Sequence, residues 1–307
     1  MSHKEHNLSN WTEEELMEAY RLGDAGAFSE LYDRYSGRAY GFFGFHLHLW
    51  GLMIDSADIA FYVSHWPVLY EDNHLLGLYK PAGLLVQGDR TGDPCLLDLG
   101  KSWLKARYDK PGQVFLGLVH RLDRPVAGAV MFARTSKAAA RLSAQFRERR
   151  VTKDYLAVVH GRMETESGEL SHHLVREGAS SRVADAATGG AKAARLTYCR
   201  LGIQADRSLV AVSLLTGRRH QIRAQLAAIG HPILGDLRYG APAPLPNGQI
   251  ALLARQLGVT HPTKQARILL DSPIPAGWPW PGPEAAGGDV PWTWREMEAA
   301  LTADSGI

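Results

Sequence analysis

The chain has 307 residues, 45% of them hydrophobic, and a formal net charge of +2 at pH 7, so it can bury a substantial core. No long apolar run lacks polar breaks, and residues 1–10 lack an apolar secretory core, which argues against a membrane span or a signal peptide. The two cysteines, Cys95 and Cys199, have no metal-site spacing and fit a reducing compartment. The sequence therefore predicts a soluble, cytoplasmic protein.

A helix start is specified near the N-terminus. Thr12 and Glu15 have the spacing of a capping box, and Trp11 and Leu16 have that of a hydrophobic staple. We expect amphipathic helices to follow as far as about Phe43.

The most informative stretch is His120-Arg121-Leu122-Asp123, which is followed by Gly128. It lies between two apolar runs, residues 114–119 and 128–133, and each run predicts a buried strand. Asp123 is therefore expected on the connection between strands, where functional side chains tend to lie. On spacing alone, an Arg-Asp ion pair that holds a turn explains the stretch about as well as catalysis does.

A strongly basic segment follows. Residues 134–153 contain seven Lys or Arg against the single acid Glu148. Ala138, Leu142 and Phe146 repeat at four-residue spacing, which predicts a helix with these side chains toward the core. The outer face of this helix is cationic and suits contact with phosphates, although a solvated basic face needs no partner.

Later segments alternate between regular structure and loops. Lys153 to Gly161 predicts a strand, and Gly178 to Ala194, rich in Ala, Gly and Ser, predicts a mobile surface loop. A second basic cluster, Arg218, Arg219 and Arg223, opens a predicted helix that runs to Ile229 and stops at Gly230 and Pro232. The Pro-rich stretches 241–246 and 273–283 predict further loops.

Between about residues 66 and 280, motifs occur in an order and at a spacing that together are specific. They are Leu69 to Asn73, Lys80-Pro81-Ala82-Gly83-Leu84, the His120 to Asp123 stretch with Gly128, Lys153-x-Tyr155, Thr216-Gly217-Arg218-x-His220-Gln221-Ile222-Arg223, and a tail of Ile229-Gly230-His231-Pro232, Gly235-Asp236 and Tyr239-Gly240. This pattern resembles the RluA-like pseudouridine synthases. Two departures are Val126-Ala127, where the family usually has Thr-Ser, and Tyr79, where it usually has asparagine.

The resemblance implies an α+β fold, with a mixed, largely antiparallel sheet flanked by helices and the catalytic loop at a central cleft. It implies isomerisation of uridine to pseudouridine in ribosomal or transfer RNA, without a metal or an organic cofactor. We expect the catalytic domain at residues 66–307, a helical appendage at residues 1–65, and a monomer. Because no segment resembles the small RNA-binding domain that many family members carry, substrate choice is expected to depend on the catalytic domain itself.

The resemblance also implies the site residues. Asp123 takes the position of the essential aspartate, which acts as a nucleophile or as a base on the ribose. Arg223 matches the active-site arginine, and a guanidinium there would keep Asp123 charged and oriented. Tyr155 matches a tyrosine that can stack on the uracil and take part in proton transfer. One carboxylate is expected to suffice, because uracil is a stabilised leaving group, and Asp236 is expected to order a turn.

Positions that could contact RNA, or help to displace the target nucleotide, are basic or histidine side chains near these motifs. They are His120, Arg121, Arg141, Arg150, Lys153, Arg218, Arg219 and His220. For His120, a structural role within the core is the more common alternative. The predicted loop at 178–194 is a further candidate for RNA contact.

Two other classes of protein are possible. Residues 11–45 weakly resemble the beginning of region 2 of an extracytoplasmic-function sigma factor, but no complete promoter-reading helix follows. A non-catalytic RNA-binding protein would keep the basic helix and tolerate the loss of Asp123. A kinase is excluded, because the chain lacks a glycine-rich phosphate loop and a metal-binding DFG motif.

Overall fold

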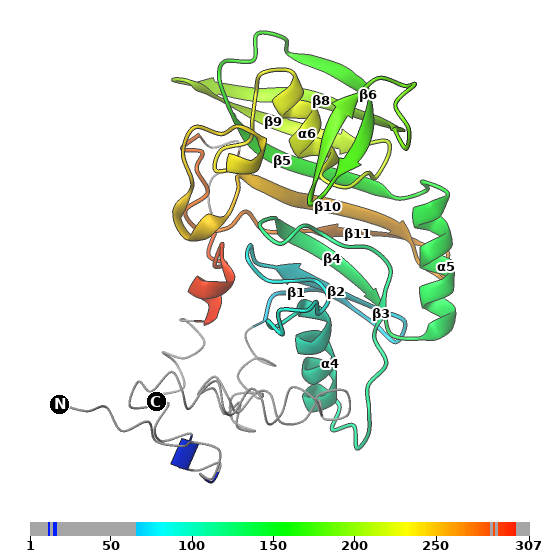
Figure 1. The fold of residues 1–307 in the computed structure, drawn as a ribbon. Helices are drawn as coiled ribbons and strands as arrows, with labels where there is room; N and C mark the ends of the chain where they lie inside the picture. Colours follow the sequence, from blue (N-terminus) through cyan, green and yellow to red (C-terminus); the bar gives the residue numbers. More distant parts are fainter. Residues whose placement is uncertain (1–11, 13–14, 17–65, 283–284, 286–287, 299–307) are drawn as a thin grey trace, which may run out of the picture. The chain divides into compact units, whose positions relative to one another are not determined.

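The computed structural model describes residues 12, 15–16, 66–282, 285 and 288–298 (Figure 1). The chain divides into two units, residues 1–55 and 56–307. In the first unit, the Thr12 N–H donates to Glu15 Oε2 at 2.8 Å and the Glu15 N–H donates to Thr12 Oγ1 at 3.3 Å. The predicted capping box is therefore confirmed. Trp11 of the predicted staple, and the rest of the segment that resembles a sigma factor, lie outside the described residues.

One continuous sheet organises the second unit. Its strands are β1 (Val68–Glu71), β2 (Leu75–Lys80), β3 (Gly117–Leu118), β4 (Ala127–Ala133), β5 (Thr152–His160), β6 (Ser167–Glu177), β7 (Ser180–Ala184), β8 (Lys192–Gln204), β9 (Arg207–Leu214), β10 (Leu252–Thr260) and β11 (Arg267–Asp271). The order is β1-β2-β4-β10-β5-β9-β8-β6-β7, with β11 on β10 and β3 on β4. Among these described strands only β4 and β10 pair in parallel, which confirms the predicted mixed, largely antiparallel sheet.

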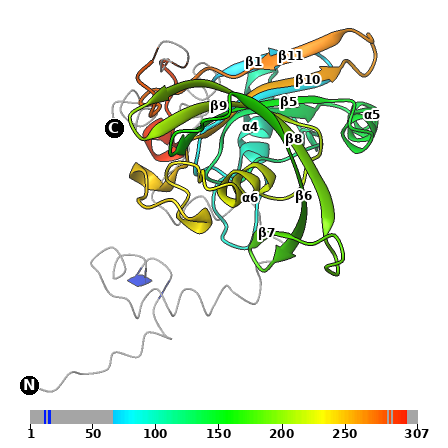
Figure 2. The same ribbon diagram turned by 90° about the horizontal axis from the view of Figure 1, so that it is seen from above.

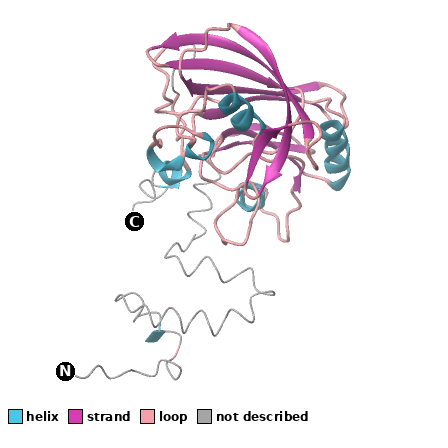
Figure 3. Cartoon of the chain, turned by 45° about the horizontal axis from the view of Figure 1, so that its top comes forward, coloured by secondary structure: helices cyan, strands magenta, loops and turns pink. Residues whose placement is uncertain are grey.

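Helices flank this sheet. They are α4 (Leu96–Arg107), α5 (Ser136–Arg147), α6 (Gln221–Ala228) and the short 3₁₀ turns η2 (Leu237–Tyr239) and η3 (Pro246–Gly248). Figures 2 and 3 show that β6 and β8 curve away from β10 and that α6 lies inside this curve. None of the described helices is long and apolar enough to cross a membrane.

The two faces of β4 enter different cores, because successive side chains of a strand point to opposite faces. Met131 packs in the cluster that includes Ala138 and Leu142 of α5. Phe132 belongs to the larger cluster that continues across β5 and α6. The sequence prediction that Ala138 and Leu142 face inward is therefore confirmed, whereas α5 ends at Arg147 and Lys153 lies on β5.

Two predicted elements differ in the structure. The strand expected at 114–119 shrinks to β3, because β3 shares one edge of β4 with β10, which occupies that edge at Ala127 and Gly128. The prediction of a loop at 178–194 is confirmed only for residues 185–191: β6 and β7 form a hairpin before it, and β8 begins at Lys192. Gly178, with φ of 55°, makes the tight hairpin turn, a signal that the Ala- and Ser-rich composition obscured.

Gly128 is required where β4 meets β10. Its φ is +132°, and a Cβ there would lie 2.4 Å from the backbone oxygen of Ala254. We expect Gly128→Ala to lower the free energy of unfolding by at least about 2 kcal/mol, because backbone strain and overpacking add. Gly230→Ala is the control: φ is +83° but no atom lies within 4 Å, so about 1 kcal/mol is expected. Equal losses in urea unfolding would contradict this account of Gly128.

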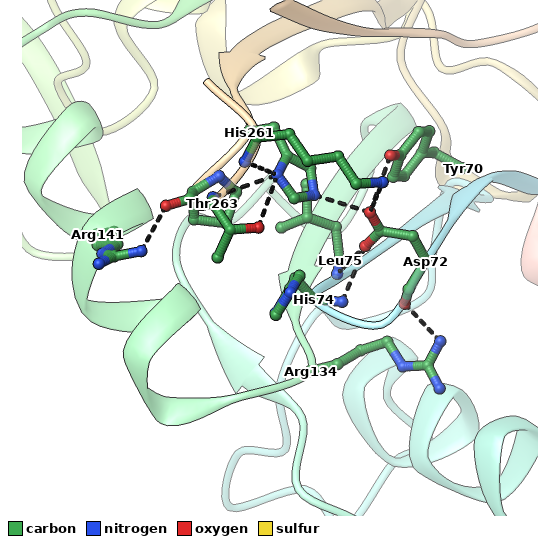
Figure 4. Close-up of polar contacts among 10 residues, drawn as sticks. Tyr70, Asp72, His74, Leu75, Arg134, Arg141, His261 and Thr263 are labelled. Atoms are coloured by element: carbon green, nitrogen blue, oxygen red, sulfur yellow. Dashed lines mark hydrogen bonds and ion pairs between the residues drawn. The ribbon is translucent and has the colours of Figure 1, made fainter. Parts of the chain in front are cut away.

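A hydrogen-bonded cluster around Asp72 joins the β1–β2 turn to the segment between β10 and β11 (Figure 4). The backbone N–H groups of Thr263 and Lys264 donate to His261 Nδ1, so its Nε2–H donates to Asp72 Oδ2 at 2.7 Å. The Lys264 ammonium also donates to Asp72 Oδ2, at 3.0 Å. Asp72 is therefore a structural anchor of these two connections.

The same cluster predicts how stability depends on pH. Burial opposes ionisation of Asp72, but hydrogen bonds from His74, Lys264, Leu75 and His261 outweigh it and hold the pKa of this carboxyl well below its usual range. The stabilisation is therefore present above the ordinary aspartate pKa of about 4 and lost as the pH falls through the lowered folded-state pKa. We expect Asp72→Asn to cost about 2 kcal/mol at pH 7 and progressively less below pH 4, measured by urea unfolding. A difference independent of pH would contradict this role.

Candidate active site

The connection between β3 and β4 carries Asp123, and α6 carries Arg223, 100 residues further along the chain. Arg223 Nη1 donates to Asp123 Oδ2 at 3.1 Å. The Arg223 side chain is only 6% exposed, whereas that of Asp123 is 30% exposed. A buried guanidinium therefore holds a carboxylate that a ligand can still reach.

A second carboxylate, that of Asp236, fixes the orientation of the Arg223 guanidinium. Asp236 Oδ2 and Oδ1 accept from Arg223 Nε at 2.7 Å and from Nη2 at 2.8 Å, and the Asp236 side chain is 1% exposed. Burial opposes the charge of Arg223, but Asp236 and then Asp123 raise the pKa of the guanidinium. The bidentate pair uses the planar fork of arginine and leaves Nη1 for Asp123.

His220 forms the other side of this arrangement. Its Nε2 lies 3.5 Å from Asp123 Oδ2, and its Nδ1 lies 2.8 Å from the Tyr239 hydroxyl. The Tyr239 oxygen already accepts from the Ser181 N–H at 2.9 Å, so its proton is available to Nδ1 and the imidazole proton faces Asp123. Burial lowers the pKa of His220 to about 4, so the ring is neutral at physiological pH.

Tyr155 of β5 is the third predicted catalytic residue. Burial first, and then the charges of Asp123 and Asp154, raise the pKa of the Tyr155 hydroxyl well above its usual range. The Tyr155 side chain is therefore neutral, and it is near enough to Asp123 to feel its charge. A neutral ring is suited to stacking on a base.

The polar residues of the Thr216–Arg223 motif build the turn that precedes α6. Gln221 Oε1 accepts from Thr216 Oγ1 and from the Arg218 N–H, and its Nε2 donates to the Arg195 oxygen of β8. His220 is in the left-handed region, with φ of 52°. These bonds explain why the motif needs Thr and Gln, and they set where α6 starts and how Arg223 projects.

Lys80 supports the loop that carries Asp123, because its side chain is hydrogen-bonded to the neighbouring residue Arg124. Its ammonium is fully buried and donates to the backbone oxygens of Pro81, Leu84 and Arg124, the last at 3.1 Å. Burial lowers the pKa of Lys80 to about 7. Tyr79, one of the departures from the family pattern, is also buried and donates through its hydroxyl to Pro291.

The residues predicted to contact RNA fall into different environments. His120 is occupied within the protein: its Nε2 accepts from the Met131 N–H at 2.9 Å and its ring stacks on Phe146. Burial lowers the pKa of His120 to about 3. Both its ring face and its acceptor nitrogen have intramolecular partners, which favours the structural role of His120 over contact with RNA.

The other predicted positions stay nearer the surface. Arg121 is exposed, Arg141 donates to the Pro262 oxygen, and Arg150 pairs with Glu148 at 2.6 Å. Arg219 donates to the backbone oxygen of Ala179 in the β6–β7 turn, and Arg218 donates to that of Ala193 on β8, so both tie the turn before α6 to neighbouring strands. His220 lies at the Asp123 site rather than on the outer surface.

Sequence reasoning missed two members of the site. Asp236 was expected to order a turn, but its carboxylate binds Arg223, and Tyr239 was only part of a matching tail. The Arg223 guanidinium also lies 4.9 Å from the Tyr239 ring centroid. The tail motif itself was the available signal, because it places one acid and one aromatic residue shortly after the arginine helix.

Comparisons with known proteins identify the class. Residues 74–228 match the model of the RNA pseudouridylate synthase family. The chain is 33% identical over 211 residues to an uncharacterized RNA pseudouridine synthase, YhcT, of Bacillus subtilis, covering 68% of each protein. It therefore belongs to this family, which confirms the resemblance drawn from the motifs.

Two more relatives agree with this. The dual-specificity RNA pseudouridine synthase RluA of Haemophilus influenzae is 34% identical over 64% of this chain and 87% of that protein. The ribosomal large subunit pseudouridine synthase D of Nitrosomonas europaea is 35% identical, but only 62% of its length is covered. Among solved structures, human RNA pseudouridylate synthase domain containing 4 superimposes with a TM-score of 0.62 at 24% identity, over 74% of this chain and 95% of that one. This likeness confirms the α+β fold.

Proposed function

We propose that this protein isomerises uridine to pseudouridine in ribosomal or transfer RNA, and that Asp123 is the essential catalytic group. The observation that carries the proposal is the Asp123 carboxylate itself, held 3.1 Å from a buried guanidinium yet 30% exposed. Family membership supplies the reaction class. The monomeric state and the cytoplasmic location remain predictions.

The reaction balances without a co-reactant. The bond from the ribose anomeric carbon to N1 of uracil breaks, the base turns, and C5 joins the same carbon. The proton leaves C5 and N1 gains one, so the product is an isomer of the substrate. Asp123 acts either as a nucleophile on the ribose or as a base on it, and Tyr155 stacks on the uracil within proton-transfer reach of C5.

Charge explains why one acting carboxylate is enough. Arg223 and the neutral His220 N–H both face Asp123 Oδ2, at 3.1 and 3.5 Å, so the anion is oriented before substrate arrives. Asp236 is neutralised by Arg223 and is 1% exposed, so it serves as a positioning residue rather than a second acid. The proposed contacts to the RNA backbone are Arg121, Arg141, Arg150, Lys153, Arg218 and Arg219.

The test is a pseudouridine map of ribosomal and transfer RNA from cells with and without the gene. At least one site is expected to disappear in the deletion strain, to return with the wild-type gene, and to stay absent with an Asp123→Asn copy. Identical maps with and without the gene would overturn the proposal. A non-catalytic RNA-binding protein would give restoration by the Asp123→Asn copy.

A further inference from the structure

A cavity of about 450 Å³ lies at the start of β5, outside the group formed by Asp123, His220, Arg223 and Asp236. Arg149, Thr152, Lys153 and Asp154 line it from one side, and Ser213 and Leu215 line it from the end of β9. Its volume falls within the range of ligand-binding pockets.

Two cationic side chains, Arg149 and Lys153, line this cavity. Burial and then the neighbouring charge of Arg149 lower the pKa of Lys153, so the two positive groups act on each other. Neither forms an ion pair with a carboxylate in the part of the chain that the structure describes, whereas the adjacent Arg150 pairs with Glu148. An anion between Arg149 and Lys153 would relieve the repulsion.

The rest of the lining suits a nucleoside. Asp154 Oδ1 accepts from the Ser213 hydroxyl at 2.6 Å, which leaves Oδ2 as an acceptor for a base amino group or a ribose hydroxyl. Leu215 is 41% exposed and offers an apolar surface at the same opening. Arg149 and Lys153 at one part of the lining and Leu215 at another give the cavity a cationic site and an apolar wall.

The cavity also adjoins the proposed active site. Lys153 and Tyr155 are two residues apart on β5, so they share one face of the strand and are separated by about 7 Å. The Lys153 Nζ lies 3.3 Å from where a Cβ of Gly217 would be, beside the turn that leads to His220 and Arg223. If the target nucleotide of an RNA strand stacks on Tyr155, the neighbouring nucleotide of that strand would thus reach the cavity.

We propose that this cavity binds a nucleotide adjacent to the target uridine, with its phosphate between Arg149 and Lys153 and its base against Leu215. The inference rests on the proposed function, because it needs an RNA strand anchored at Asp123. It gives the enzyme a second point of contact that fixes the direction and register of the strand.

The experiment measures binding of ribosomal and transfer RNA, isolated from cells that lack the gene, across a series of salt concentrations. The proteins carry Asp123→Asn as a background so that no turnover occurs. Arg149→Asn and Lys153→Gln are each expected to reduce the slope of log Kd against log salt by about 1, because each removes one phosphate contact. Asn is chosen at position 149 because the backbone there is left-handed, with φ of 58°.

Three further variants distinguish the effects of charge, of apolar contact and of a distant surface cation on RNA binding. Lys153→Arg keeps the charge and is expected to keep the slope of the parent. Leu215→Ser is expected to raise Kd about threefold to tenfold at every salt concentration without changing the slope. Arg162→Asn removes an exposed cation just beyond the opposite end of β5 and is expected to leave both Kd and slope unchanged.

The inference is overturned if Arg149→Asn and Lys153→Gln keep the parental slope while their thermal unfolding matches that of the parent. It is equally overturned if Lys153→Arg loses as much of the slope as Lys153→Gln. Failure of the proposed function is a different result: the wild-type protein would then produce no pseudouridine in these RNAs, whatever the salt slopes.

Discussion

Asp123→Asn is expected to reduce the rate of pseudouridine formation by at least about 10³-fold while changing RNA affinity by no more than about threefold. The amide keeps the size of the side chain and still accepts from Arg223 Nη1, which lies 3.1 Å from Oδ2 in the native protein. What it loses is the negative charge, which either attack on the ribose or removal of a proton requires. The measurement is single-turnover formation of pseudouridine with saturating enzyme.

The matched control is Asp206→Asn, which removes an exposed carboxylate between β8 and β9 that pairs with Arg207 at 3.6 Å. This variant is expected to keep the wild-type rate of the chemical step. A comparable loss of rate at saturating enzyme in both variants would show that the Asp123 effect is not specific. Wild-type turnover in Asp123→Asn would remove Asp123 from the chemistry altogether.

Asp236→Asn is expected to lower the free energy of unfolding by about 3–5 kcal/mol. Its carboxylate forms two hydrogen bonds with Arg223, and both side chains are almost fully buried, 1% and 6% exposed. Without the charge, the guanidinium stays buried with only the partly exposed Asp123 as counterion. The same change is expected to slow turnover, because Arg223 no longer has a fixed orientation toward Asp123.

Glu169→Gln provides the comparison for Asp236→Asn. Glu169 also accepts two hydrogen bonds from one arginine, Arg195, at 2.7 and 3.1 Å, but the two side chains are 39% and 53% exposed. Water screens a solvated pair of this kind, so Glu169→Gln is expected to have a much smaller effect than Asp236→Asn in urea unfolding. Equal losses in the two variants would contradict the importance of burial at Asp236.

The strands and helices at the centre of the fold could be predicted from the sequence because local patterns determine them. The apolar run at 128–133 became β4, and the four-residue spacing of Ala138 and Leu142 became α5. The run at 114–119 failed because competition with β10 for one edge of β4 is a property of the whole sheet. The hairpin of β6 and β7 was missed because small residues in a strand resemble those of a loop.

The candidate site likewise contains residues that local motifs predicted and residues whose roles depend on the whole fold. The motif spacing singled out Asp123 and Arg223, and the structure brings their side chains within 3.1 Å. Asp236 could not be assigned, because its role depends on a buried geometry between α6 and the following turn. His120 lies in the motif stretch, yet only the structure shows that its ring stacks on Phe146.

The most direct test of the central claim is a crystal structure of the Asp123→Asn variant bound to an RNA that it recognises. We predict a target uridine extruded from the stack, its anomeric carbon within about 3.5 Å of the side chain at position 123 and its uracil on the Tyr155 ring. An RNA bound elsewhere, with the side chains of residues 123 and 223 facing only solvent, would contradict the account.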